Sequence, residues 1–277
     1  MIRVVTDSSC DIPQNLAEER SIDIVPLTIR FGDDEYVDRQ ELTTAMFWDR
    51  LVTTDHLPET AAPSAGLFEE RYETLIDDGA TGIVVLTISS KLSATYQSAV
   101  IAAERISGRV PIRVIDSHSV GMGLGLPVLE AAGTASKGAP IDEVVARAGE
   151  AIAGTTVIAA LDTLDYLRRG GRIGSTQAFF GSLLNIKPLI TLDDGVVAPL
   201  GRVRTRSKAI AALEERIAAL GPSILAAALF HGAAPDIARI VESMEGHLEI
   251  PIIETLLGAV VGTHTGPGMV GIAYLTS

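Results

Sequence analysis

A glycine-rich run near the end of the chain combines the residue types of a binding loop. Residues 258–271 hold five glycines, two threonines and one histidine, His264. Glycine reaches backbone angles that other residues rarely adopt. Chain ends usually fray and tolerate change, so a run with special backbone demands in that place suggests a loop that closes onto a ligand. We predict that His264 forms one wall of a ligand site whose other wall lies far upstream.

The same run does not fit a nucleotide loop. Residues 266–271 match the letters of the dinucleotide fingerprint G-x-G-x-x-G, which needs a strand before it, a helix after it and an acidic residue ~20 positions further on. Only six residues follow, and they are typical of a strand. Residues 121–125 are also glycine-rich, but their spacing predicts tight helix packing. The chain has no P-loop either, and we expect no cofactor.

A polar turn at residues 89–93 could hold an anion. It follows an apolar strand at 82–88 and precedes a helix that we expect to begin at Ala94. With Ser93 as the N-cap, the N–H groups of residues 94–96 and the helix dipole would favour a carboxylate or a phosphate. The alternative is that Ser93 only caps its own helix. Thr60, in an irregular stretch before Pro63, either points its hydroxyl at a ligand or makes a local turn.

Arginines gather beside turns in two places, which are residues 168–172 and 202–206. A run of charge usually forms a solvated face. The net charge of the chain is −13, however. Two basic groups against that background suggest either a bound anion or an acidic protein partner.

Other site chemistries lack their sequence patterns. The five histidines do not have the spacing of a metal site, and no G-x-S-x-G segment is present. Cys10 follows the first strand, where a nucleophile could lie, but a lone cysteine is more often a small buried packing residue. We therefore expect no metal and no catalytic residue.

Composition excludes further classes of protein. The chain has 277 residues, 47% of them apolar and 21% charged, as in a globular protein with a sizeable core. Its negative charge argues against nucleic acid as a partner. A single cysteine fits a reducing compartment. Asp7 rules out a signal peptide, and no apolar run reaches the ~18 residues of a membrane span. We expect a cytoplasmic protein without an integral membrane segment.

The order of elements predicts an α/β fold. A strand, a polar turn and a helix follow one another three times in the first half, with strands at 3–6, 82–88 and 112–115, which indicates a parallel sheet in α/β/α layers. Residues 23–30 are predicted as one further strand. In the second half, Asp193–Gly195 predicts a hairpin between 186–192 and 196–204, and thus a mixed sheet. We predict two domains, residues 1–155 and 156–277, with the run around His264 as a rigid glycine hairpin.

These motifs resemble those of the DegV family of fatty-acid-binding proteins, which in some bacteria serve as the binding subunit of fatty acid kinase. The resemblance covers essentially the whole chain. It rests on six segments in the family's order: 4–11, 88–98, 114–117, 167–173, 185–188 and 262–268.

The resemblance implies a long-chain fatty acid between two domains, with its tail in an apolar tunnel. The residues that it places at the carboxylate are Thr60, Ser93 and His264, with Arg172 beside them and Ser90 as a further candidate. This chain departs from the family in one segment. Where the family often has Thr-Ser-Gln-Pro-Ser, residues 60–64 read Thr-Ala-Ala-Pro-Ser and lack two polar side chains.

Three hypotheses for function remain open at this point. The leading one is a non-enzymatic fatty acid carrier that presents the carboxylate to a partner kinase, which phosphorylates it to an acyl phosphate, with Arg202 and Arg204 in the docking surface. The second is an enzyme that holds a carbonyl substrate covalently on His264, as in the related dihydroxyacetone kinase fold. The third is a regulatory protein that responds to lipid.

Overall fold

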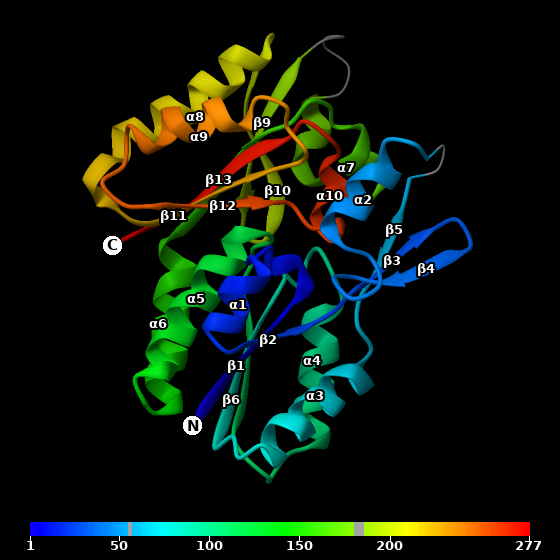
Figure 1. Cartoon of the computed structure of the whole chain (residues 1–277), viewed down its shortest axis with the longest axis vertical. Coiled ribbons are helices and arrows are strands. Elements are labelled where there is room, and N and C mark those ends of the chain that lie inside the picture. The colour runs from blue at the N-terminus through cyan, green and yellow to red at the C-terminus, as the bar shows by residue number, and fades with distance from the viewer. Residues whose placement is uncertain (55–56, 180–185) are drawn as a thin grey trace.

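The computed structural model describes residues 1–54, 57–179 and 186–277 (Figure 1). Asn185, which belongs to one of the six motifs above, lies outside the described residues. The chain forms two large sheets, one from each half of the sequence, and a small third sheet beside them.

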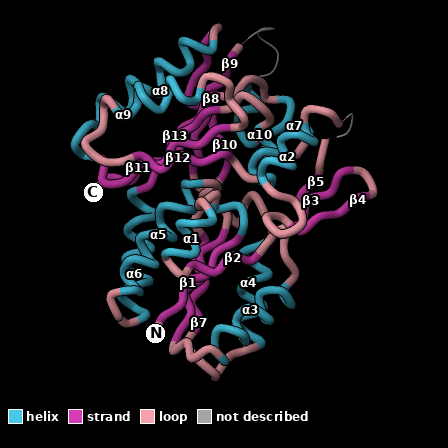
Figure 2. The backbone as a smooth tube through the Cα atoms, in the orientation of Figure 1, coloured by secondary structure: helices cyan, strands magenta, loops and turns pink. Residues whose placement is uncertain are grey.

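The first half contains a four-stranded parallel sheet in the order β2-β1-β6-β7. Its strands are β1 (Ile2–Asp7), β2 (Ile22–Val25), β6 (Gly82–Thr87) and β7 (Ile112–Asp116). Helices α3 (Ala65–Asp77) and α4 (Thr95–Arg105) lie on one side, and α5 (Met122–Ser136) and α6 (Ile141–Gly154) on the other (Figure 2). Strand β6 is buried along its whole length, as its apolar sequence requires of a strand covered on both faces. The predicted parallel α/β/α layers are confirmed.

The second half forms a six-stranded mixed sheet in the order β10-β9-β8-β13-β11-β12. Its strands are β8 (Thr155–Ala160), β9 (Lys187–Asp193), β10 (Val196–Val203), β11 (Ile224–His231), β12 (Ile252–Leu256) and β13 (Val270–Thr276). Only β11 and β12 run parallel. Helices α8 (Arg206–Leu220) and α9 (Ile237–Glu245) cover one face. The predicted mixed sheet is confirmed, and a division at residues 155–156 remains our proposal.

The predicted hairpin forms between β9 and β10. Asp194 and Gly195 make its two-residue turn with φ angles of 47° and 77°. Positive φ at both positions matches the twist of the flanking strands, and it favours an Asp-Gly pair.

The strand predicted at residues 23–30 is wrong, because two strands of different sheets occupy it. Pro26 separates β2 from β3 (Thr28–Phe31). Proline has no N–H to donate to a strand ladder, and β2, an edge strand of its sheet, ends at the residue before it. Strand β3 instead pairs with β4 (Asp34–Val37) and β5 (Glu59–Ala61) in a small antiparallel sheet, which projects from the side of the molecule in Figure 1.

The glycine hairpin predicted around His264 is also wrong, since residues Ala259–Thr265 form helix α10. Gly258 is the N-cap of this helix and Gly266 its C-cap, with a φ of 73°, so these two glycines mark the helix ends while Gly262 lies inside the helix. A Cβ at Gly262 would lie 2.5 Å from a ring carbon of Phe47 and 2.9 Å from one of Trp48. The glycine therefore lets α10 pack closely on α2 (Thr44–Leu51).

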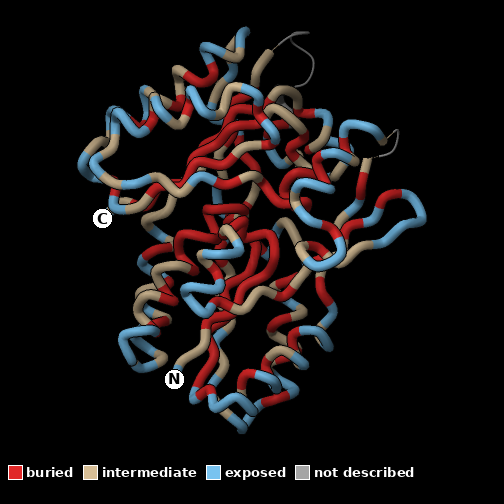
Figure 3. The backbone as a smooth tube through the Cα atoms, in the orientation of Figure 1, coloured by how far each residue is buried: buried red, intermediate tan, exposed pale blue. Residues whose placement is uncertain are grey.

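Helix α5 lies between the two large sheets, in contact with β1 and β6 on one side and with β8, β11 and β13 on the other. Most of its residues are buried, and the strands that it contacts form the buried centre of the molecule (Figure 3). A Cβ at Gly123 would lie 2.3 Å from Val157 Cγ2, and one at Gly125 would lie 2.7 Å from the carbonyl oxygen of Cys10. Tight helix packing is thus confirmed for Gly123 and Gly125, whereas Gly121 is the N-cap of α5 and has a φ of 62°. No helix of the described residues combines the length and the apolarity that a bilayer crossing requires.

The close approach at Gly125 predicts a matched pair of mutants in α5. We expect Gly125→Ala to lower the free energy of unfolding by ~1–3 kcal/mol through overpacking. Gly133→Ala, where no heavy atom lies within 4 Å of the added Cβ, should instead raise it by ~0.5–1 kcal/mol. Urea unfolding of the three proteins measures both changes, and equal effects at the two positions would contradict the packing described.

Candidate ligand-binding site

A cavity of about 1070 Å³, its open mouth included, lies between the two large sheets. It meets the parallel sheet at the carboxyl ends of its strands, where ligands bind in open α/β folds. From that side it is lined by Leu27, Ile88 and Val120, and from the mixed sheet by Val157, Ile190 and Val197. The lining is mainly apolar. Among the residues that the structure describes, six polar ones also line it: Thr60, Ser93, Arg172, Thr191, His264 and Thr265.

His264 and Thr60 meet at this cavity. The last turn of α10 carries His264, and β5 carries Thr60. The imidazole Nε2 lies 3.0 Å from Thr60 Oγ1, although 204 residues separate the two in sequence. The structure therefore places the upstream wall predicted for His264 in the small antiparallel sheet of the first half.

The His264 imidazole is held in its neutral form. Burial lowers the pKa of His264 to about 4, with a smaller contribution from the positive charge of Arg172. At neutral pH the ring carries one N–H, so Thr60 Oγ1 either accepts that proton or donates its own. The other ring nitrogen, Nδ1, is buried, and no hydrogen-bond partner for it exists among the described residues. A Cβ at Gly170 would lie 2.1 Å from Nδ1, so only glycine fits against this side of the ring.

Arg172 brings a permanent positive charge to the cavity. It follows α7 (Asp165–Arg169), and its guanidinium donates to the carbonyl oxygens of Gly170 at 2.7 Å and Leu92 at 3.2 Å. These two bonds fix the side chain across the two halves of the chain. Together with neutral hydroxyls and an imidazole, this charge makes the polar end of the cavity suitable for an anion.

Ser93 lines the cavity but is not the N-cap predicted. Helix α4 begins at Thr95 with Ala94 as its N-cap. Ser93 Oγ accepts the Thr95 N–H at 3.3 Å and lies 2.8 Å from Thr95 Oγ1. The turn from Ser89 closes through bonds from the N–H groups of Leu92 and Ser93 to the Ser89 carbonyl, which delays the helix start by one residue. One of the three N–H groups expected to be open to an anion is therefore in use.

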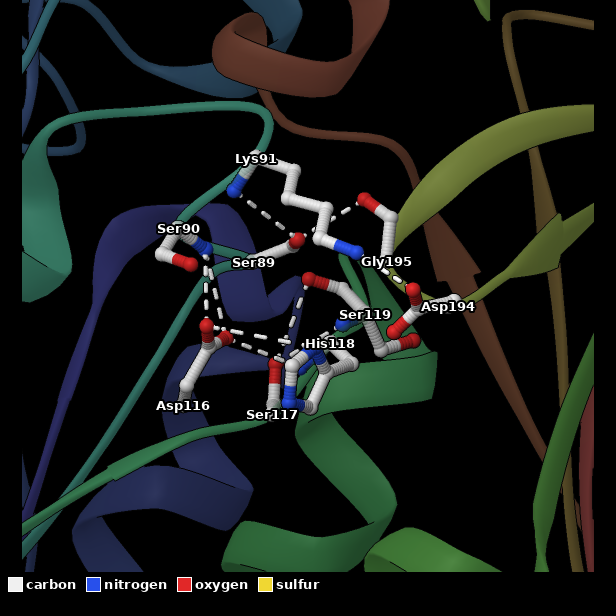
Figure 4. Close-up of polar contacts among 9 residues, drawn as sticks. All are labelled: Ser89, Ser90, Lys91, Asp116, Ser117, His118, Ser119, Asp194 and Gly195. Carbon is white, nitrogen blue, oxygen red and sulfur yellow. Dashed lines mark hydrogen bonds and ion pairs between the residues drawn. The ribbon is translucent and has the colours of Figure 1, made fainter. Parts of the chain in front are cut away.

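Ser90 belongs to the same turn (Figure 4), but the residues that line the cavity do not include it. Its backbone N–H lies 3.2 Å from both carboxylate oxygens of Asp116, and its side chain is exposed. Ser90 is therefore not brought together with Thr60, Ser93 and His264.

Ser89 is a buried residue of this turn whose role the sequence did not indicate. Its hydroxyl donates to the Gly195 carbonyl at 2.7 Å, and Lys91 Nζ lies 2.5 Å from Asp194 Oδ2 (Figure 4). These contacts tie the turn before Ser93 to the tip of the β9–β10 hairpin, whose strands line the opposite wall of the cavity. The hairpin itself was predictable, but a partner 106 residues away was not.

The remaining candidates lie away from the cavity. Arg202 and Arg204 are exposed at the end of β10. Arg206, from the same basic group, instead pairs with both carboxylate oxygens of Asp236. Cys10 is fully buried, and burial raises the pKa of its thiol to about 12, as expected of a packing residue. Of the two alanines that replace polar residues of the family pattern, Ala62 lines the cavity whereas Ala61 is exposed.

Comparison with known proteins identifies the class. The model of the DegV family, described as "Uncharacterised protein, DegV family", matches residues 1–277. A DegV domain-containing protein of Streptomyces coelicolor is 42% identical over 98% of this chain and 97% of its own length. The chain therefore belongs to the DegV family.

Solved structures of two other DegV proteins have the same fold. One is from Thermus thermophilus, whose structure is described as showing fatty acid binding; it shares 32% identity and a TM-score of 0.91 over 100% of this chain and 99% of its own. The other is DegV of Bacillus subtilis, described as a fatty acid binding protein, with 31% identity and a TM-score of 0.88 over 100% of this chain and 99% of its own.

The buried imidazole predicts a pH dependence of stability. The pKa of His264 is about 4 in the folded protein and 6.5 in its ordinary state, so between these values the unfolded chain binds more protons. Stability is thus lost as the pH falls from 6.5 to 4. Across this pH range, the free energy of unfolding of the wild type should fall by on the order of 3 kcal/mol relative to that of His264→Gln. Urea unfolding at a series of pH values measures it, and parallel curves for the two proteins would contradict a neutral buried His264.

Proposed function

We propose that this chain binds one long-chain fatty acid in the cavity between its two sheets, with the carboxylate at Thr60, Ser93, Arg172 and His264. The observation that carries the proposal is the distribution of polarity. A mainly apolar cavity has at one place a pair of hydroxyls, an imidazole and a fixed guanidinium.

The physical chemistry of a fatty acid matches this distribution. Each methylene buried in the apolar part contributes ~0.8 kcal/mol. A carboxylate taken from water into the same cavity loses its hydration and needs partners in return. Arg172 supplies the opposite charge, while the hydroxyls and the neutral imidazole supply hydrogen bonds. The relatives described as fatty acid binding proteins support the same ligand class. The apolar lining favours a lipid over a small polar carbonyl compound.

The ligand test is extraction and rebinding. Mass spectrometry of an organic extract of the purified protein should find a long-chain fatty acid in about one equivalent, and stripped protein should bind palmitate or oleate. Recovery of no fatty acid, together with no binding of either one, would contradict the proposal.

Two serines of one turn provide a matched pair for the head group. Ser93→Ala should weaken palmitate binding by roughly 10- to 100-fold, because a hydrogen bond to a charged group contributes ~1.5–3 kcal/mol. Ser90→Ala, outside the cavity, should bind as the wild type does. Isothermal titration with both variants measures the difference, and equal affinities would remove Ser93 from the site.

We further propose that the chain is a carrier without catalytic activity, which presents the carboxylate to a separate fatty acid kinase subunit. No nucleotide-phosphate motif occurs in the sequence, so the phosphoryl donor would bind to the partner. Arg202 and Arg204 are exposed on the half of the chain that carries His264, and they would meet acidic side chains of that partner.

The docking proposal predicts that a variant can keep its affinity for fatty acid and still fail to present the fatty acid to the kinase subunit. Arg202→Glu combined with Arg204→Glu should leave palmitate affinity unchanged, since neither residue lines the cavity. The same variant should reduce acyl phosphate formation by at least tenfold when a bacterial fatty acid kinase subunit and ATP are added. Unchanged acyl phosphate formation would place the docking surface elsewhere.

A further inference from the structure

Asp11 connects the first half of the chain to the helix that carries His264. It follows β1 and a short 3-10 turn (Ser8–Cys10), and only 1% of its surface is exposed. Its Oδ1 accepts the Gly258 N–H at 2.9 Å, and its backbone carbonyl accepts the Thr255 hydroxyl at 3.0 Å. One residue thus holds two points of the segment that leads into α10.

The segment between these points has a third connection. The indole N–H of Trp48 donates to the Leu257 carbonyl at 2.8 Å. Residues 255, 257 and 258 are therefore each fixed by a group from the first half. Helix α10 begins directly afterwards and is only seven residues long, so His264 lies within ~10 Å of Gly258 along the helix axis. Because the helix is this short, a displacement of its first residue moves the His264 ring by a similar distance.

The contact between Asp11 and Gly258 has no spare room. A Cβ at Gly258 would lie 2.7 Å from Asp11 Oδ1, closer than ordinary van der Waals contact. Glycine at this position is thus required for the carboxylate to reach the N–H. Asp11 does not line the candidate cavity, so it acts on a ligand in that cavity only through other residues.

We propose that Asp11 is a positioning residue for the head-group end of the cavity. Through its bond to Gly258 it fixes α10, and through α10 it sets the 3.0 Å contact between His264 and Thr60. This role in affinity rests on the proposed fatty acid function, whereas the position of the His264 ring can be tested without any ligand.

Three variants test the bond from both sides. Asp11→Ala removes the acceptor and should weaken palmitate binding by roughly tenfold, as for a buried donor left without its partner. Asp11→Asn keeps an oxygen acceptor of the same shape and should remain within about threefold of the wild type. Gly258→Ala crowds the same hydrogen bond from the helix side, so on its own it should weaken palmitate binding. Added to Asp11→Ala, where the bond is already lost, it should have little further effect.

The second measurement is the imidazole NMR signal of His264 in ligand-free protein, assigned from its absence in His264→Gln. Asp11→Ala should shift it, and Asp11→Asn should restore it. A purely structural role would lower stability without moving this signal.

A folded Asp11→Ala protein with wild-type affinity and an unshifted His264 signal would overturn the proposal, and so would additive effects of Asp11→Ala and Gly258→Ala. If Asp11→Ala does not fold, Gly258→Ala provides the test, and wild-type affinity with an unshifted His264 signal in that variant would overturn the proposal. Failure of the wild type to bind any fatty acid would contradict the function proposed above and leave the NMR result to decide the role of Asp11.

Discussion

A carboxylate cannot be buried among apolar side chains unless charge and hydrogen bonds replace its water, and this constraint underlies the head-group site that we propose. The contact between His264 and Thr60 joins a helix of the second half to a strand of the first. Arg172 binds the carbonyl of Leu92, which directly precedes Ser93. The polar end of the cavity is therefore complete only when both halves of the chain are in place.

Helix α10 is the element that makes this convergence possible, and it is fixed at both ends. Asp11 holds its N-terminal side at Gly258. On its C-terminal side, Arg206 donates to the carbonyl of Gly268 while it pairs with Asp236. Gly262 lets the helix approach Phe47 and Trp48 in between. Within this run Gly262 therefore serves helix packing, whereas Gly266 and Gly268 adopt positive φ angles where the chain leaves the helix.

Much of the fold could be predicted from local sequence patterns. Alternation of apolar strands and helices indicates the parallel sheet, and Asp194–Gly195 identifies the hairpin of the mixed sheet. Two errors in the fold have different physical causes. Pro26 is a local signal that separates two strands of different sheets. The run around His264 forms a helix whose close packing depends on residues distant in sequence, because Gly262 lies against Phe47 and Trp48.

Part of the candidate site could likewise be predicted from the sequence, and part could not. His264, Thr60, Ser93 and Arg172 were identified by motif, and all four line one cavity. The motif also included Ser90, because sequence proximity cannot tell which side of a turn a residue faces. The roles of Ser89 and Asp11 depend on partners 106 and 247 residues away, which no local pattern encodes.

A crystal structure of the protein with palmitate is the most direct measurement of the central proposal. The carboxylate should lie within hydrogen-bonding distance of His264, Thr60 or Ser93, near Arg172, with the acyl chain between the two sheets. An empty cavity at saturating palmitate, or a chain bound with its methyl end at His264, would contradict it.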